Sequence, residues 1–318
     1  MTLQELLAQY DEKRNAQEKR LAAQQQAMFL AHPELLCLQE QKKDIILRQL
    51  AAVMKNPERK DAILAEFAQK TAVLEERIAD YLEKTGAQMP APRFDCPLCQ
   101  DSGYVQHKNR REFCPCLREQ LYEKVLGGQR VETLEGSFAA FNEKVFPDAQ
   151  QDGGASQRSR IMAIRSFAEG YCDAFPGNPQ KQLLFMGKPG LGKSYLLACM
   201  CKQLRAKQRD ICYLGAYALF ELFHRDRLGE AALLEPVYEA KILVIDDLGS
   251  EPMTQNVTKE YFFDLLCARS RAGLHTFMAT NHGTAQLKER YTERVSSRLL
   301  SKQNSLVIRF VGEDLRLL

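Results

Sequence analysis

Apolar side chains recur at helical spacing along the first part of the chain, which contains no glycine before Gly86. The clearest stripe consists of Ile63, Phe67, Leu74, Ile78 and Tyr81. This spacing predicts an amphipathic helix. Because Asn56-Pro57-Glu58 is typical of a helix start and Gly86 of a helix end, we expect the helix to lie between them.

A second helix is predicted to begin at His32-Pro33-Glu34. Its apolar residues are Leu35, Leu36, Leu38, Ile45, Ile46, Leu47 and Leu50. Residues 2–31 are rich in glutamine and only partly striped. We therefore expect residues 1–89 to form a helical arm, either a hairpin or a small bundle. Its stripes either cover each other or dock a partner, and the pattern leaves both open.

Farther along, the pattern changes to short continuous apolar runs, which are typical of strands buried in a parallel sheet. These runs lie at 183–186, 211–214, 242–245, 276–279 and 305–310. A helical stripe precedes the first run and consists of Ile161, Ile164, Phe167, Ala168 and Tyr171. Strands alternating with helices predict an α/β domain over residues 161–318.

The first run leads into Gly187-Lys188-Pro189-Gly190-Leu191-Gly192-Lys193-Ser194. This segment matches the phosphate-binding loop G-x-x-x-x-G-K-[ST] at every fixed position, between a strand and a helix as the motif requires. Backbone N–H groups of such a loop surround phosphate oxygens at a helix N-terminus. We expect Lys193 to reach the β- and γ-phosphates and Ser194 to bind Mg²⁺. Tyr195 is included among the nucleotide-binding residues.

Polar side chains end two of the later runs. Asp246 and Asp247 follow the strand at 242–245, and the carboxyl ends of parallel strands face the nucleotide crevice. Asp246 is expected to hold Mg²⁺, directly or through water, and Asp247 to orient or deprotonate the attacking water. Asn281 is expected to bind that water or the γ-phosphate. Since Asn281-His282-Gly283 is also turn-like, a plain turn is the alternative.

Two arginines, Arg294 and Arg298, stand at i and i+4 on one predicted helix face. An arginine that reaches the γ-phosphate of a neighbouring subunit strongly accelerates phosphoryl transfer. The alternative is an ordinary surface ion-pair face, because Glu289 and Glu293 are close in the sequence.

Four cysteines form two close pairs, Cys96 with Cys99 and Cys114 with Cys116. Such pairs supply the thiolates of a tetrahedral Zn²⁺ site from two tight turns. The second pair is C-x-C rather than the commoner C-x2-C, and His107 is a possible replacement ligand. An iron–sulfur cluster and unconnected thiols are the alternatives. We expect a structural zinc module over residues 90–130, a segment too small for a core of its own.

The composition narrows the function class only a little. Among 318 residues the net charge is +3, which gives no global argument for nucleic-acid binding. Because there is no long apolar run and no signal-peptide pattern, we expect a cytoplasmic protein with no membrane partner. Its 10 cysteines are then expected to be thiols or metal ligands rather than disulfides. Residues 131–160 are predicted to be a linker, with an exposed loop at 152–156.

Several of these motifs, taken in order, resemble those of an AAA+ ATPase, and more narrowly those of the helicase-loader and IstB branch (DnaC, DnaI, IstB). They are the phosphate loop, Asp246-Asp247-Leu248-Gly249, Ala279-Thr280-Asn281 and Glu293-Arg294-Val295-Ser296-Ser297-Arg298-Leu299-Leu300. The resemblance covers about residues 135–318. With Asp101-Ser102-Gly103-Tyr104 between its cysteine pairs, the cysteine segment further resembles zinc-bearing DnaI-like loaders. IstB-type transposition helpers lack such a module.

The resemblance implies a five-stranded parallel sheet without a helical lid domain, and ATP at its crevice. It assigns residues 187–194 to Walker A, Asp246 and Asp247 to Walker B, and Asn281 to sensor 1. Ser297-Arg298-Leu299 matches the arginine-finger segment, which favours Arg298 over Arg294. Asp247 stands where most AAA+ enzymes carry glutamate, and its shorter side chain suits slow, partner-dependent hydrolysis. Arg316 is the only late candidate for a second sensor arginine.

The expected function is therefore an ATP-dependent loader of the replicative hexameric DNA helicase, with ATP, Mg²⁺ and Zn²⁺ as cofactors. The resemblance also implies self-association through the ATPase domain and binding of single-stranded DNA. An IstB-like transposition helper and a nucleotide-gated adaptor with negligible turnover are the alternatives. Local basic candidates for DNA binding are Lys202, Arg205, Lys207, Arg209, Arg225 and Arg227.

Overall fold

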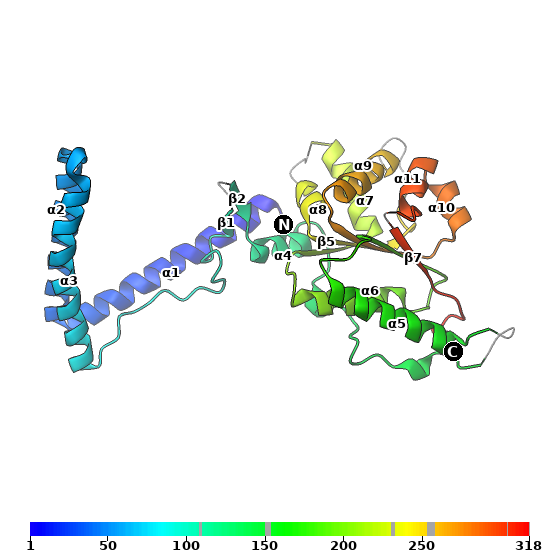
Figure 1. The fold of residues 1–318 in the computed structure, drawn as a ribbon, viewed down its shortest axis with the longest axis horizontal. Coiled ribbons are helices and arrows are strands. Elements are labelled where there is room, and N and C mark those ends of the chain that lie inside the picture. Colours follow the sequence, from blue (N-terminus) through cyan, green and yellow to red (C-terminus); the bar gives the residue numbers. More distant parts are fainter. Residues whose placement is uncertain (108–109, 150–153, 230–232, 253–257, 304, 318) are drawn as a thin grey trace. The chain divides into compact units, whose positions relative to one another are not determined.

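The computed structural model describes residues 1–107, 110–149, 154–229, 233–252, 258–303 and 305–317 (Figure 1). The chain divides into two compact units, one formed by residues 1–6 and 103–318 and the other by residues 7–102. Each unit has a hydrophobic core of its own. No described helix is long and apolar enough to cross a membrane.

The N-terminal region is helical, as expected. Helix α1 spans Leu3–Ala31, α2 Pro33–Lys55 and α3 Lys60–Thr85. Helices α2 and α3 lie side by side as a hairpin (Figure 1). The core between them consists of Leu35, Leu38, Leu74 and Ile78. The two apolar stripes therefore cover each other near the open end of the hairpin.

The start of α3 differs from the prediction. Asn56 makes no side-chain capping bond, and a 3-10 turn at Pro57–Arg59 comes before the α-helix, which begins at Lys60. A proline restricts the preceding residue to extended conformations, and Asn56 has φ −135°. The segment therefore turns the chain from α2 into α3 instead of capping α3 directly. The predicted end is correct, because Gly86 follows α3 in the left-handed region with φ 66°.

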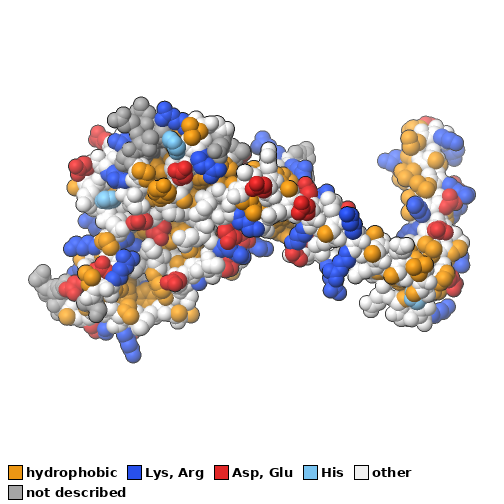
Figure 2. Space-filling view, turned by 180° about the vertical axis from the view of Figure 1, so that it is seen from behind, with side chains coloured by type: hydrophobic (Ala, Val, Ile, Leu, Met, Phe, Trp, Pro, Cys, Tyr) orange, Lys and Arg blue, Asp and Glu red, His pale blue; other side chains and the backbone are white. Residues whose placement is uncertain are grey.

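Helix α2 also carries apolar side chains that nothing in the hairpin covers. Leu47, Leu50 and Met54 are 55%, 56% and 80% exposed. They stand three and four residues apart, so they share one helix face. Figure 2 shows hydrophobic side chains at the surface of the hairpin. Only part of the second apolar run is therefore core, and the rest forms uncovered apolar surface.

The cysteine segment contains a small antiparallel hairpin and a helix. Strands β1 (Tyr104–His107) and β2 (Arg110–Phe113) pair, and α4 (Pro115–Lys124) follows. Proline at the first helical position is well tolerated because its missing N–H has no partner there. The predicted alternative ligand His107 has a side chain outside the described part of the structure.

A five-stranded parallel sheet forms the centre of the larger unit, which confirms the predicted α/β fold. The strands are β3 (Gln182–Met186), β4 (Ile211–Gly215), β5 (Ile242–Leu248), β6 (His275–Thr280) and β7 (Ser305–Arg309). Their order is β4-β5-β6-β3-β7. Because all strands are parallel, the residues that follow β3, β5 and β6 meet at one edge of the sheet.

Helices cover both faces of this sheet (Figure 1). Helices α5 (Gln157–Ala174) and α6 (Lys193–Arg205) lie on one face. The other face carries α7 (Ala216–Arg227), α8 (Glu235–Glu239), α9 (Thr258–Arg271), α10 (Thr284–Arg290) and α11 (Glu293–Leu299). The described residues after β7 contain no helix.

The segment between α4 and α5 packs onto the sheet domain. It contains short 3-10 turns at Val131–Thr133 and Glu143–Val145. Val131, Leu134 and Phe146 are buried in the same core as the strands. The loop expected at 152–156 lies partly outside the described residues. Ser156, at its end, caps α5 by accepting a hydrogen bond from the backbone N–H of Ser159.

Candidate nucleotide site and cysteine cluster

The loop between β3 and α6 surrounds the ammonium group of Lys193. Lys193 Nζ donates to the carbonyl oxygens of Gly187 and Lys188 and to Asn281 Oδ1, each at 2.7 Å. The side chain is buried, and this burial lowers the pKa of Lys193 to about 8. All three acceptors are neutral. An anionic phosphate oxygen would be a stronger partner, because charge-assisted hydrogen bonds are the stronger ones.

The C-terminal segment crosses this loop at Gly190. Leu315 N donates to the carbonyl oxygen of Gly190 at 3.2 Å. Gly190 has φ 72°, and a Cβ atom there would lie 1.5 Å from Asp314 Oδ1. The phosphate-loop pattern does not require glycine at this position. The close approach of Asp314 therefore explains why glycine occupies a position at which the motif allows any residue.

Ser194 and Asp246, the predicted Mg²⁺ ligands, lie next to each other. Ser194 Oγ donates to Asp246 Oδ1 at 2.9 Å, and the same oxygen accepts from the backbone N–H of Asp247 at 2.9 Å. Mg²⁺ prefers oxygen ligands and is usually held by one or two protein groups together with phosphates and water. The two side chains thus fit the ion that the sequence predicts for them.

Asn281 joins the phosphate loop to the acidic pair. Its Oδ1 accepts from Lys193, and its Nδ2 donates to Asp247 Oδ1 at 2.7 Å. The structure therefore places Asn281 in the site and engages its amide there rather than in a local turn. Asp247 has φ 54°, an uncommon value for a residue other than glycine. Uncommon backbone conformations are concentrated at functional sites.

A cavity of about 450 Å³ adjoins the loop, within the range of small-molecule sites. It is lined by Ala140, Phe141, Asn142, Val145, Phe146, Gly190, Leu191, Gly192, Lys193, Ser194, Tyr195, Leu315 and Arg316. The Phe141 and Phe146 rings stack with centroids 5.8 Å apart, and Tyr195 meets Phe141 edge-on at 5.9 Å. Aromatic faces next to a phosphate loop suit a nucleotide base.

The sequence left open which residues contact the base. In the sequence, Phe141 and Phe146 lie in a segment without periodicity, so no pattern marks them as base-binding residues. Arg316, the late candidate for a second sensor arginine, lines the same cavity.

Helix α11 presents both candidate arginine fingers to the surface. Arg294 and Arg298 are exposed, and neither lines the cavity of its own chain. The Arg294 guanidinium lies over the ring of Phe263, 5.5 Å from its centroid. An exposed position leaves these arginines accessible to a neighbouring subunit, as it would on an ordinary surface face, and the role of each arginine stays a prediction.

A buried carboxylate that has no sequence signature holds the segment after Asp247. The Glu251 side chain is fully buried and accepts from the backbone N–H of Gly249 at 2.7 Å and from Arg290 Nε at 3.2 Å. Tyr291 Oη also donates to it. These bonds connect the segment after β5 to the end of α10, just before the helix α11 that carries the candidate arginines.

Two of the basic residues predicted to bind DNA instead make contacts that stabilise the fold. Arg205 pairs with Glu119 and Glu132. Lys207 donates to the carbonyl oxygens of Cys172 and Asp173. Both side chains attach neighbouring segments to α6, so they are weaker DNA candidates than the sequence suggested.

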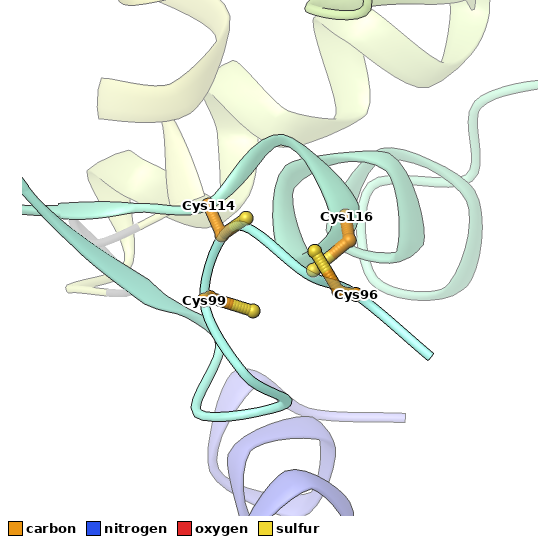
Figure 3. Close-up of side chains that lie close together, drawn as sticks. All are labelled: Cys96, Cys99, Cys114 and Cys116. Carbon is orange, nitrogen blue, oxygen red and sulfur yellow. The ribbon is translucent and has the colours of Figure 1, made fainter. Parts of the chain in front are cut away.

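The four predicted zinc ligands come together. The Sγ atoms of Cys96, Cys99, Cys114 and Cys116 all lie within 4.8 Å of one another. Figure 3 shows the four sulfur atoms turned toward a common space. Zn–S bonds of about 2.3 Å in a tetrahedron place sulfur atoms about 3.8 Å apart, so small shifts suffice to close the site on Zn²⁺. The four thiols therefore form one cluster, which does not agree with the alternative of unconnected thiols, and none of the 10 cysteines is in a disulfide.

Asp101 fixes the turn that carries the first cysteine pair. It is buried, and its carboxylate accepts from the backbone N–H groups of Asp95 at 3.0 Å and Cys96 at 2.9 Å. Ligands held by such hydrogen bonds are oriented before a metal binds. The cluster is compatible with the predicted zinc module.

Comparison with known proteins gives sequence relatives but no matching family profile. The replicative helicase loader DnaC of Escherichia coli (strain K12) is 28% identical over 159 residues, which cover 49% of this chain and 64% of DnaC. The replicative helicase loader DnaI of Bacillus subtilis (strain 168) is 29% identical over 142 residues, 43% of this chain and 44% of DnaI. The chain is thus similar in sequence to the DnaC/DnaI helicase loaders.

The relationship to DnaC and DnaI covers part of each protein, since the chain spans 64% of the length of the first and 44% of the second. A crystal structure of DnaI aligns with 29% identity and a TM-score of 0.43, over 57% of this chain and 94% of that one. The parallel sheet, the phosphate loop and the order of the motifs agree with the AAA+ fold that the sequence predicts. The roles of single residues stay predictions.

Proposed function

We propose that this protein is an ATP-dependent loader of the replicative DNA helicase. The observation that carries the proposal is the sequence similarity to two replicative helicase loaders, DnaC and DnaI. A chain of hydrogen bonds through the site supports it: Lys193 donates to Asn281, Asn281 donates to Asp247, and Asp246 accepts from Ser194 and from the backbone N–H of Asp247.

In the proposed reaction the protein positions the nucleotide and stabilises charge, which is most of what phosphoryl transfer needs. Lys193 exchanges its neutral acceptors for the phosphates. Ser194 and Asp246 hold Mg²⁺, which when bound neutralises charge on the phosphates. Asp247 and Asn281 orient the attacking water. The aromatic wall of Phe141 and Phe146 holds the base.

Hydrolysis takes place between subunits in this proposal. Arg298 of one copy reaches the γ-phosphate bound to its neighbour, so the ATPase domains self-associate. Turnover is slow without a partner, because Asp247 is shorter than the usual glutamate and its carboxylate is bonded to Asn281. Contact with the helicase and single-stranded DNA completes the site.

The regions before the ATPase domain direct this chemistry to its partners. We assign residues 1–89 to helicase docking, residues 90–130 to the zinc module and residues 161–318 to the ATPase domain. Residues 131–160, predicted as a linker, join these parts and pack on the ATPase domain through Val131, Leu134 and Phe146. The exposed face of Leu47, Leu50 and Met54 supports a docking role for the arm. Single-stranded DNA lies along the inner face of the assembly. The protein acts in the cytoplasm.

One alternative has an observation in its favour. The engagement of Asp247 by Asn281 also suits a nucleotide-gated adaptor with negligible turnover. A transposition helper is disfavoured, because the IstB-type helpers lack a cysteine module.

The test uses the full chain. ATP hydrolysis is measured alone, with single-stranded DNA and with the replicative helicase, and helicase capture is measured by affinity pull-down. We expect stimulated hydrolysis that Lys193→Ala abolishes and that Lys241→Ala, which changes an exposed lysine, retains. Absence of both helicase capture and stimulated hydrolysis contradicts the loader. Intact ATP binding and helicase capture with flat, near-zero hydrolysis indicate the adaptor.

A further inference from the structure

Tyr213, on strand β4, stands beside the carboxylate of Asp246 on strand β5. In the parallel register Gly215 pairs with Asp246, and Tyr213 is two residues before Gly215. Side chains two residues apart point to the same face of a sheet. Tyr213 and Asp246 therefore lie diagonally on one face, a separation that an aromatic side chain can bridge.

The phenol of Tyr213 holds one oxygen of this carboxylate. Tyr213 Oη donates to Asp246 Oδ2 at 2.7 Å. The other oxygen, Oδ1, accepts from Ser194 Oγ and from the backbone N–H of Asp247, each at 2.9 Å. Because each oxygen has its own donors, the carboxylate cannot rotate without breaking hydrogen bonds. Oδ1 is thereby kept toward Ser194.

Tyr213 is itself held in place by its surroundings. The residue is 2% exposed, so its ring is held by the surrounding core. Its carbonyl oxygen accepts from the backbone N–H of Gln129 at 2.9 Å, in an isolated bridge on β4. Strand β4 is at the edge of the sheet, and Gln129 follows α4 in the chain. The segment after the cysteine cluster therefore pins the strand at Tyr213.

We propose that Tyr213 is a positioning residue for the magnesium site, which holds Asp246 so that its Oδ1 and the Ser194 hydroxyl face the same ion. The phenol does not line the cavity beside the phosphate loop, so its role is to act through Asp246. This inference rests on the proposed binding of ATP with Mg²⁺. It names a residue that the Walker motifs do not contain.

The test compares Tyr213→Phe with a matched control. Tyr213→Phe removes one hydroxyl and keeps the ring. Tyr171→Phe, on α5, removes another buried hydroxyl. This hydroxyl donates to the carbonyl oxygen of Gln180 at 2.8 Å, just before the start of β3, whereas Asp246 is near the carboxyl end of β5. ATP binding to each full chain is measured by calorimetry over a range of Mg²⁺ concentrations and in EDTA.

For Tyr213→Phe we expect the Mg²⁺ concentration at half-maximal enhancement of ATP binding to rise about tenfold, the usual effect of losing a hydrogen bond to a metal ligand. ATP binding in EDTA should not change, because Tyr213 does not line the cavity beside the phosphate loop. Tyr171→Phe should match the wild type in both measurements. Should Tyr213→Phe fail to fold, Tyr213→Met also lacks the donor, packs adaptably, and carries the same expectation.

Two outcomes overturn the inference, and they differ. A folded Tyr213→Phe chain with the wild-type Mg²⁺ dependence shows that the hydroxyl does not position Asp246, and leaves the nucleotide site intact. A wild-type chain that binds no ATP at any Mg²⁺ concentration removes the proposed function, and this inference with it.

Discussion

Replacing Asp210 by asparagine should loosen the attachment of α4 to the sheet. The buried carboxylate, just before β4, accepts from Tyr122 Oη at 2.6 Å and from Arg118 Nη1 at 3.2 Å, both on α4. The backbone N–H of Lys241 donates to it at 3.3 Å. Asparagine has almost the same shape, but it is uncharged and one of its terminal groups is a donor. The asparagine Oδ1 can still accept from one of the two side chains, but its Nδ2 group then faces the other donor, so that hydrogen bond is lost.

The size of the effect follows from these bonds. A hydrogen bond to a charged group contributes about 1.5–3 kcal/mol and a neutral one about 0.5–1.5 kcal/mol, so weakening the Tyr122 bond costs about 1 kcal/mol. Losing the charged bond to Arg118 costs about 2 kcal/mol more. Arg118 keeps Glu239 at 3.2 Å, which limits the loss. We expect the free energy of unfolding to fall by about 3 kcal/mol, the lower end for breaking a buried ion pair.

The assay is urea unfolding of the full chain, followed by far-ultraviolet circular dichroism. The control is Glu169→Gln, which removes a more exposed ion pair with Arg165 within α5, and should cost less than about 0.5 kcal/mol. Asp210→Asn should lower the midpoint without changing the slope, which reports the surface exposed on unfolding. An effect as small as that of Glu169→Gln would refute the view that Asp210 anchors α4.

Three further predictions address the metal, the pH and the arginines. Elemental analysis should find about one zinc per chain, and chelation should lower the unfolding midpoint; a metal-free chain with unchanged unfolding contradicts the site. Burial lowers the pKa of His275 from 6.5 to about 4, so the unfolded chain takes up the proton first and stability falls as the pH drops through this window, by up to about 3 kcal/mol. His275→Phe should reduce that loss of stability at low pH. If the free energy of unfolding of the variant and of the wild type falls equally with pH, His275 is not its source. Arg298→Ala should lower helicase-stimulated hydrolysis about 10³-fold with ATP binding unchanged, and an equal effect of Arg294→Ala removes the preference for Arg298.

The sequence by itself determined the features that depend on short spacings. These features are the phosphate loop, the acidic end of β5 and each of the two cysteine pairs. The residues within each feature are close in the chain, so local geometry alone brings their side chains together. The strands were equally visible, because a strand buried on both faces must be continuously apolar. The helical stripes showed that α2 and α3 are amphipathic, which is also a local property.

Only the tertiary structure decided which distant residues meet. Tyr122 is 88 residues from Asp210, and Tyr213 is 33 residues from Asp246, and no local pattern connects either pair. The stacked Phe141 and Phe146 became a candidate base-binding wall only because their loop folds back onto the phosphate loop. In the same way, periodicity marked Leu35 and Leu50 alike as apolar positions of α2, yet one is core and the other exposed. Periodicity gives the face of a helix, whereas burial depends on whether another element covers it, and that is a property of the whole fold.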